Sequence, residues 1–205
     1  MPSAPGDAGG GAPVAPAGRD DGRGSAGGAV VRSELAARLA ALIVDVPDFP
    51  RPGIVFKDLT PLLADAEGFA LVVDGILAQH ARSFDVVAGI EARGFMIGAA
   101  VGYAAGVGFV PVRKAGKLPR RALSASYALE YGEATLEVHA DAFLAGQRVL
   151  VVDDVLATGG TAAATLGLVK RAGGEPVGLS VVLELAFLDG RSRLAGYPVH
   201  ALLTA

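Results

Sequence analysis

Residues 148–161 read Arg-Val-Leu-Val-Val-Asp-Asp-Val-Leu-Ala-Thr-Gly-Gly-Thr. The apolar run Val149–Val152 is short and unbroken, which is typical of a strand buried on both faces of a parallel sheet. Two acids and a Thr-Gly-Gly-Thr turn end this predicted strand, and residues 162–170 follow with a helical pattern. A strand that leads into two carboxylates and a glycine turn before a helix can bind a phosphate and a polyol side by side.

The rest of the chain alternates predicted strands with predicted helices. Helices are expected from Ser33 to before Pro47, from Asp65 to about Arg82, from Gly94 to about Tyr103 and over 189–195, and strands over 85–90, 107–112, 177–185 and 199–203. Residues 46–61 are rich in proline and are predicted to form an ordered loop. Such alternation predicts right-handed crossovers, so the expected fold class is α/β, with helices flanking a central, mostly parallel sheet.

A polar segment at residues 113–132 interrupts this alternation. It begins with Arg113-Lys-Ala-Gly-Lys117 and ends at Gly132. A turn at Gly132 and a return strand at Thr135–Val138 predict a hairpin. Long basic segments inside a compact α/β domain are typical of lids and active-site loops, so we expect a flexible lid here.

Composition limits the number of domains and the kinds of partner. Residues 1–29 hold nine Gly, seven Ala and four Pro, too little apolar surface to offset the entropy of ordering, so we expect a disordered tail before one domain at 30–205. The net charge of −3 gives no electrostatic reason to expect nucleic acid or an anionic membrane as partner. The chain has no Cys and shows neither a secretory signal nor a long apolar run, which makes the cytoplasm the default location.

The acid pair and the glycine turn suit adjoining parts of one ligand. Ligands of open parallel sheets bind beyond the carboxyl ends of the strands, where these residues are expected. Backbone N–H groups at the glycines can converge on an anion at the helix N-terminus, and Thr158 and Thr161 can add hydroxyl donors. Asp153 and Asp154 are suited instead to accept hydrogen bonds from sugar hydroxyls.

Residues 153–161 resemble the phosphoribosyl-diphosphate binding motif of the type I phosphoribosyltransferase family. Four further segments resemble the adenine-specific branch of that family in order and spacing: Glu91-Ala-Arg-Gly-Phe95, Phe109-Val-Pro-Val-Arg-Lys114, Gly116-Lys-Leu-Pro119 and Tyr127-Ala-Leu-Glu-Tyr-Gly132. The resemblance covers roughly residues 33–203. It implies the family's fold, with a small hood and a flexible lid, a homodimer, and AMP formation from adenine and phosphoribosyl diphosphate with release of diphosphate.

The resemblance also implies a role for each matching residue. The ribose and 5′-phosphate would be bound by Asp153, Asp154, Ala157, Thr158, Gly159, Gly160 and Thr161. The diphosphate would be bound by Arg93, Arg113, Lys114 and Lys117, and adenine by Val55, Phe56, Lys57, Glu91 and Ala92. The catalytic residues would be Glu130 and Tyr131. Mg²⁺ is the expected cofactor and would arrive on the substrate diphosphate, since it retains water and needs few protein ligands.

One departure and two alternatives stay open. Lys57 stands where many relatives have Arg, and the two side chains differ wherever a planar group or a fork is needed. The chain is either an enzyme for adenine, a phosphoribosyltransferase for another base, or a regulator that senses phosphoribosyl diphosphate. A regulator is expected to carry a DNA-binding module or a basic face and to lack the lid residues Glu130 and Tyr131.

Deleting residues 1–29 should leave the protein almost unchanged, because so few of their side chains can pack on the domain. The melting temperature of the truncated protein should stay within about 2 °C of that of the full chain, and its rate of AMP formation should match. A large loss of either would show that the tail packs or takes part in assembly.

Overall fold

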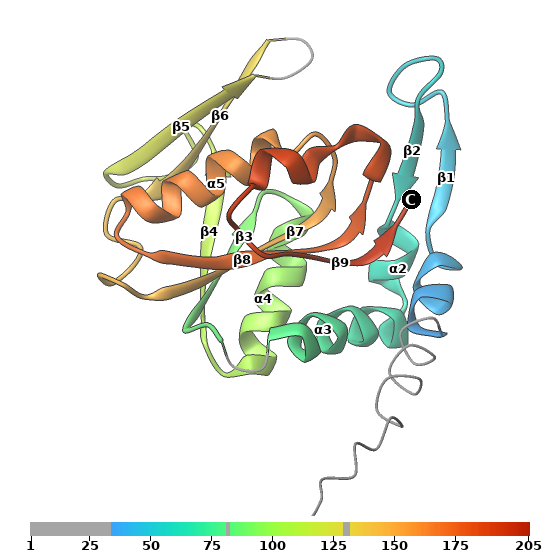
Figure 1. The fold of residues 1–205 in the computed structure, drawn as a ribbon, viewed down its shortest axis with the longest axis horizontal. Coiled ribbons are helices and arrows are strands. Elements are labelled where there is room, and N and C mark those ends of the chain that lie inside the picture. Colours follow the sequence, from blue (N-terminus) through green and yellow to red (C-terminus); the bar gives the residue numbers. More distant parts are fainter. Residues whose placement is uncertain (1–33, 81–82, 129–131) are drawn as a thin grey trace, which may run out of the picture.

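The computed structural model describes residues 34–80, 83–128 and 132–205. Most strands belong to one seven-stranded sheet in the order β5-β6-β4-β3-β7-β8-β9, and β1 and β2 form a separate two-stranded sheet (Figure 1). After a helix at residues 34–40 the elements are β1 (Val44–Pro47), β2 (Val55–Asp58), α2 (Thr60–Ala64), α3 (Ala66–His80), β3 (Val86–Ile90), α4 (Arg93–Ala105), β4 (Gly108–Lys114), β5 (Ala122–Ala128), β6 (Glu133–His139), β7 (Arg148–Leu156), α5 (Gly160–Arg171), β8 (Glu175–Glu184), η1 (Ala186–Leu188), η2 (Gly190–Leu194) and β9 (Val199–Thr204).

The pairing of the strands confirms a mostly parallel α/β sheet. Strands β4, β3, β7, β8 and β9 pair in parallel, whereas β6 is antiparallel to both β4 and β5. Every residue of β3 is buried, and Val149–Val152 of β7 have no exposed surface. The two central strands therefore carry the continuous apolar runs that burial on both faces requires.

Different helices cover the two faces of the sheet, and successive residues of β7 pack alternately against one face's helices and the other's. Val149 and Val151 pack in the apolar cluster that contains α5, whereas Leu150 and Val152 pack in the one that contains α3 and α4. In Figure 1, α3 and α4 lie below the sheet and α5 lies above it. Because α4 leaves β3 on one face and its neighbour β7 continues into α5 on the other, the connections diverge at the carboxyl ends of β3 and β7, where open sheets bind ligands.

Three element predictions need correction. The helix expected from Ser33 to before Pro47 ends at residue 40, and strand β1 begins at Val44. Residues 46–61 were expected to be a loop, but β1 and β2 pair there as a hairpin, whose turn is held by a 2.7 Å hydrogen bond from the N–H of Gly53 to Oδ1 of Asp48. Strand β7 does not end at Val152, because its pairing with β8 continues to Leu156. The acid pair is therefore part of the strand and shares its rigid backbone.

The hairpin predicted around Gly132 is confirmed. Strands β5 and β6 pair from Ala122 with His139 to Ala128 with Glu133. The predictions for residues 1–29 concern a segment outside the described residues. Within the described ranges, no helix is both long and apolar enough to span a membrane.

A buried histidine lies between α3 and the sheet. Nε2 of His80 is 2.6 Å from the hydroxyl oxygen of Ser180 on β8, and its ring centroid is 4.9 Å from that of His200 on β9. Burial, together with the nearby His200, lowers the pKa of His80 from 6.5 to about 4. The folded protein therefore keeps this imidazole neutral at a pH where the unfolded chain protonates it.

Stability should fall as the pH drops from about 6.5 to about 4, because over this range the unfolded chain binds a proton at His80 that the folded protein does not bind. At about 1.4 kcal/mol per pKa unit, the loss approaches about 3 kcal/mol. Urea unfolding should show a larger loss between pH 7 and about pH 4.5 in the parent protein than in His80→Gln, which can still hydrogen-bond Ser180. Equal losses in both proteins would contradict this assignment.

Candidate active site

The turn between β7 and α5 offers backbone donors to an anion. Gly159 has a left-handed backbone (φ 79°), and α5 begins at the next residue. The first N–H groups of a helix have no partner within it and point out of its positive end. A hollow of about 70 Å³ lies at this turn, with Asp153, Thr158 and Thr161 among its lining residues. It suits a phosphate group.

A larger cleft of about 510 Å³ shares Asp153 and Thr161 with the phosphate hollow. It lies at the carboxyl ends of β3, β4 and β7 and is lined by Glu91, Ala92, Arg93, Lys114, Tyr127, Leu136, Asp153, Asp154 and Thr161. All but Tyr127 and Leu136 were among the predicted site residues. The structure thus brings residues predicted for ribose, diphosphate and base to one cleft.

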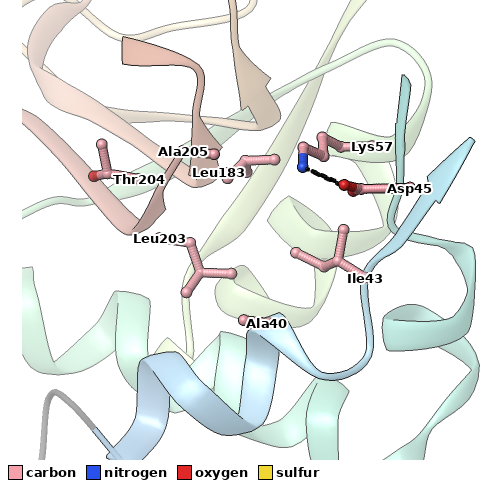
Figure 2. A pocket seen from close by; sticks show the side chains of 8 residues that line it. All are labelled: Ala40, Ile43, Asp45, Lys57, Leu183, Leu203, Thr204 and Ala205. Atoms are coloured by element: carbon pink, nitrogen blue, oxygen red, sulfur yellow. Dashed lines mark hydrogen bonds and ion pairs between the residues drawn. The ribbon is translucent and has the colours of Figure 1, made fainter. Parts of the chain in front are cut away.

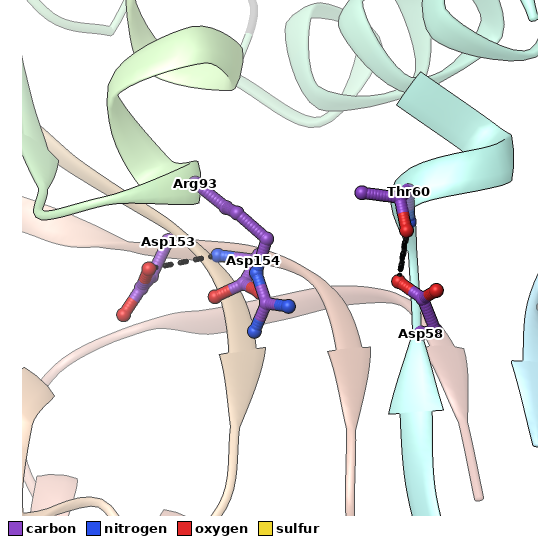
Figure 3. A network of polar contacts seen from close by, with 5 residues as sticks. All are labelled: Asp58, Thr60, Arg93, Asp153 and Asp154. Atoms are coloured by element: carbon purple, nitrogen blue, oxygen red, sulfur yellow. Dashed lines mark hydrogen bonds and ion pairs between the residues drawn. The ribbon is translucent and has the colours of Figure 1, made fainter. Parts of the chain in front are cut away.

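The acid pair and Arg93 form the charged centre of this cleft (Figure 3). Nε of Arg93 forms an ion pair with Oδ2 of the buried Asp154, and the N–H of Asp154 donates a 2.9 Å hydrogen bond to Oδ1 of Asp153. Burial raises the pKa of Asp153 well above its ordinary value, and the neighbouring charge of Asp154 raises it further. The positive charge of Arg93 thus balances the negative charge of Asp154, while the raised pKa of Asp153 favours its neutral, protonated form.

Gly94 allows helix α4 to begin this close to β7. A Cβ atom at Gly94 would lie 2.8 Å from the carbonyl oxygen of Val152 and 2.9 Å from Oδ1 of Asp153. Real Cβ atoms do not approach other atoms so closely, so only glycine fits without displacing the backbone. The position of Arg93 over the acid pair depends on this contact.

Glu91 holds the basic residues at the end of β4. Its Oε2 accepts a 2.9 Å hydrogen bond from the N–H of Lys114 and one of 3.3 Å from Nε of Arg113. The backbone bond from Lys114 is the main cause that lowers the pKa of Glu91, and the charges of Arg113 and Lys117 contribute. Lys114 lines the cleft itself, whereas Arg113 and Lys117 lie close to Glu91 without being among the cleft-lining residues.

The two-stranded sheet β1–β2 is the small hood, and its strand β2 turns its side chains alternately toward and away from Arg93. The Phe56 ring centroid lies 5.5 Å from Cζ of Arg93, whereas Nζ of Lys57 lies 2.7 Å from Oδ1 of Asp45. Figure 2 shows this Lys57–Asp45 pair in a separate hollow of about 290 Å³ beside the C-terminus. The period-two alternation of a strand explains the opposite directions. Val55 is half exposed and pairs with Pro47 of β1.

Three residues near the cleft were not predicted: Tyr127, Leu136 and Asp58. The phenolic oxygen of Tyr127 accepts a 3.1 Å hydrogen bond from the hydroxyl of Thr161. Leu136 on β6 completes the wall. Asp58 lies near Arg93 in Figure 3, and a hydrogen bond from the Thr60 hydroxyl is the main cause that lowers its pKa.

The sequence held a signal for two of these residues. Tyr127 opens the motif at 127–132, and Asp58 is two positions after Phe56 on a strand, so it shares the face of Phe56. Leu136 had no distinguishing signal. The predicted catalytic residues Glu130 and Tyr131 lie outside the described residues.

Comparison with known proteins is consistent with this geometry. The model of the phosphoribosyl transferase domain matches residues 62–195. An adenine phosphoribosyltransferase of Salinispora arenicola is 68% identical over 183 residues, which cover 89% of this chain and 95% of the relative.

Solved structures give the same relationship. The crystal structure of adenine phosphoribosyltransferase from Rhodothermus marinus is 49% identical, with a TM-score of 0.80, and the match covers 84% of this chain and 99% of that one. The enzyme from Saccharomyces cerevisiae, solved with an imino-altritol bisphosphate and adenine, is 38% identical, with a TM-score of 0.79 and coverage of 83% and 99%.

Proposed function

Because the chain belongs to the phosphoribosyltransferase family, and within it to the adenine phosphoribosyltransferases, we propose that it converts adenine and phosphoribosyl diphosphate to AMP and diphosphate in purine salvage. The observation that supports this best is the convergence of an anion-binding turn, an acid pair and fixed cations on one cleft. Those groups match the phosphate, the ribose and the diphosphate of one substrate.

The donor substrate would lie along the end of β7. The turn at residues 157–161 would bind its 5′-phosphate through backbone N–H groups and the hydroxyls of Thr158 and Thr161. Asp153 and Asp154 would accept hydrogen bonds from the ribose hydroxyls. Since positive charge develops on the sugar ring as the diphosphate leaves, the Asp154 carboxylate would also stabilise the transition state.

The diphosphate would lie on the basic side of the cleft. Arg93 and Lys114 line the cleft there, and Arg113 and Lys117 lie within electrostatic reach of Glu91 beside it. Among the described residues, no group of three or more His, Asp or Glu side chains is placed to hold a metal ion. Mg²⁺ would be carried in on the diphosphate oxygens, since it keeps several waters and needs few protein ligands, and there it would neutralise charge on the leaving group.

Adenine would bind between the hood and the turn at Glu91-Ala92. The ring of Phe56 lies beside Arg93, which lines the cleft, and would stack on the base, while Val55 and Lys57 would contribute backbone groups. Because the Lys57 side chain points to Asp45, a Lys in place of Arg leaves such backbone contacts unchanged. Glu130 would assist proton movement at the base, and Tyr131 would help close the lid over the cleft and exclude water.

We also propose that the protein acts in the cytoplasm as a homodimer, without nucleic acid or membrane partners. The homodimer is what the family resemblance implies, and the net charge of −3 gives no electrostatic reason to expect nucleic acid or an anionic membrane as partner. Light scattering of the purified protein tests the assembly.

Separate incubations with phosphoribosyl diphosphate, Mg²⁺ and each purine or pyrimidine base test the function. Adenine should be consumed and AMP formed, with little turnover of the other bases. Turnover of another base alone would identify a phosphoribosyltransferase of different specificity. Binding of phosphoribosyl diphosphate without turnover of any base would identify a sensor.

Asp154→Asn should act chiefly on KM for phosphoribosyl diphosphate, and Glu130→Ala mainly on kcat. Loss of a charged acceptor for the ribose should raise KM for phosphoribosyl diphosphate by about tenfold or more. Loss of a group that assists proton transfer should lower kcat by about a hundredfold with a smaller change in KM. The exposed Asp74→Asn and Glu133→Ala are matched controls that should leave both constants unchanged. If neither test variant alters the kinetics, the site is misplaced.

A further inference from the structure

The phosphate-binding turn rests directly on the backbone of another segment, η2. A Cβ atom at Gly190 would lie 2.1 Å from the carbonyl oxygen of Ala157 and 2.9 Å from the amide nitrogen of Gly159. From the other side, a Cβ atom at Gly159 would lie 2.3 Å from the carbonyl oxygen of Gly190. All of these neighbours are backbone atoms, so no flexible side chain can move aside to make room.

Arg191 fixes η2 against the sheet. Its Nε donates a 2.9 Å hydrogen bond to Oε1 of Glu184, its Nη2 donates to Oε2 of the same carboxylate, and its Nη1 donates a 2.7 Å bond to the carbonyl oxygen of Val199. Glu184 is the buried last residue of β8, and Val199 is the first residue of β9. A guanidinium bound in this bidentate way allows one orientation only.

The other end of η2 is held by packing. The side chain of Leu194 is 2% exposed and belongs to the apolar cluster that contains α5. Between Gly190 and Leu194, the hydroxyl of Ser192 donates a 2.8 Å hydrogen bond to the carbonyl oxygen of Asp189. With both ends fixed, η2 forms a rigid support on one side of the turn.

We propose that Gly190 and the Arg191–Glu184 pair are positioning residues for the 5′-phosphate: they hold the turn at Ala157–Gly160 so that its backbone N–H groups converge on the phosphate oxygens. None of the three lines the large cleft or the hollow at the turn. They act through the turn, and this inference rests on the proposed function for the identity of the anion.

The effect is specific to the phosphate end of the site. Hydrogen bonds weaken steeply when donor and acceptor are misaligned, so a small displacement of the turn affects several N–H groups at once. The base would lie by Phe56 of the hood and the Glu91-Ala92 turn, which make none of these contacts with η2. Changes at η2 should therefore weaken binding of the phosphoribosyl substrates and leave binding of adenine unchanged.

The first experiment compares Gly190→Ala with Gly167→Ala. Gly167 lies in α5, and a Cβ atom there meets nothing within 4 Å, so its replacement is a matched control. Gly190→Ala should raise KM for phosphoribosyl diphosphate by about tenfold or more and leave KM for adenine within about twofold. In isothermal titration calorimetry with ribose 5-phosphate alone, Gly190→Ala should show a similar loss of affinity and Gly167→Ala none.

Variants of Arg191 provide a second test that does not depend on a clash. Arg191→Met removes the bidentate pair and should weaken ribose 5-phosphate binding, and Arg191→Lys should restore only part of it, because an ammonium cannot reproduce the fork. Each variant's thermal melt is recorded beside its affinity. Unchanged ribose 5-phosphate affinity in folded Gly190→Ala, or in folded Arg191→Met if Gly190→Ala does not fold, would overturn the inference.

The same measurements separate this inference from the proposed function. If the parent protein makes AMP but the η2 variants keep normal KM values, the support by η2 is wrong and the function stands. If the parent protein makes no AMP from adenine but binds ribose 5-phosphate, and Gly190→Ala loses that binding, the proposed function is wrong and the support of the turn by η2 stands.

Discussion

Helix α4 begins where its backbone touches the backbone of β7, and the arrangement of the cleft depends on that contact. Gly94 has no room for a side chain against the carbonyl oxygen of Val152, and a Cβ atom on Gly89 would lie 2.7 Å from the carbonyl oxygen of Gly94. Two glycines thus set the distance between the helix and the central strands. Because Arg93 comes directly before Gly94, its guanidinium is placed over Asp154 by the backbone.

Paired charges complete the cleft that this contact creates. Arg93 balances Asp154, and Arg113 balances Glu91, so little uncompensated charge is placed in a region of reduced solvent access. The carboxylates in turn restrict the cations, whose long side chains would otherwise sample many rotamers. A diphosphate would therefore meet cations that are already held near their working positions, which lowers the entropy lost on binding.

Local sequence patterns were sufficient for most of the fold and for the main residues of the site. Buried parallel strands give continuous apolar runs, and the glycines at 159 and 160 mark the turn after one such strand wherever it lies in the sheet. Patterns were insufficient where distant segments meet. The direction of Lys57 depends on the pairing of β1 with β2, which the prolines between residues 46 and 61 concealed. The contact of Gly190 with Ala157 exists only once the chain beyond β8 has folded back onto the turn.

The turn at residues 157–160 presents peptide N–H groups, which neither gain nor lose a proton in the physiological range. A phosphate bound there would bring its own proton equilibrium, since the second ionisation of a phosphate monoester lies near pH 6. Asp153 lines both the hollow at the turn and the larger cleft, and burial and the charge of Asp154 raise its pKa. A change of pH would thus alter the charge of a bound phosphate and of the Asp153 carboxyl group, whereas the N–H groups of the turn would donate their hydrogen bonds unchanged.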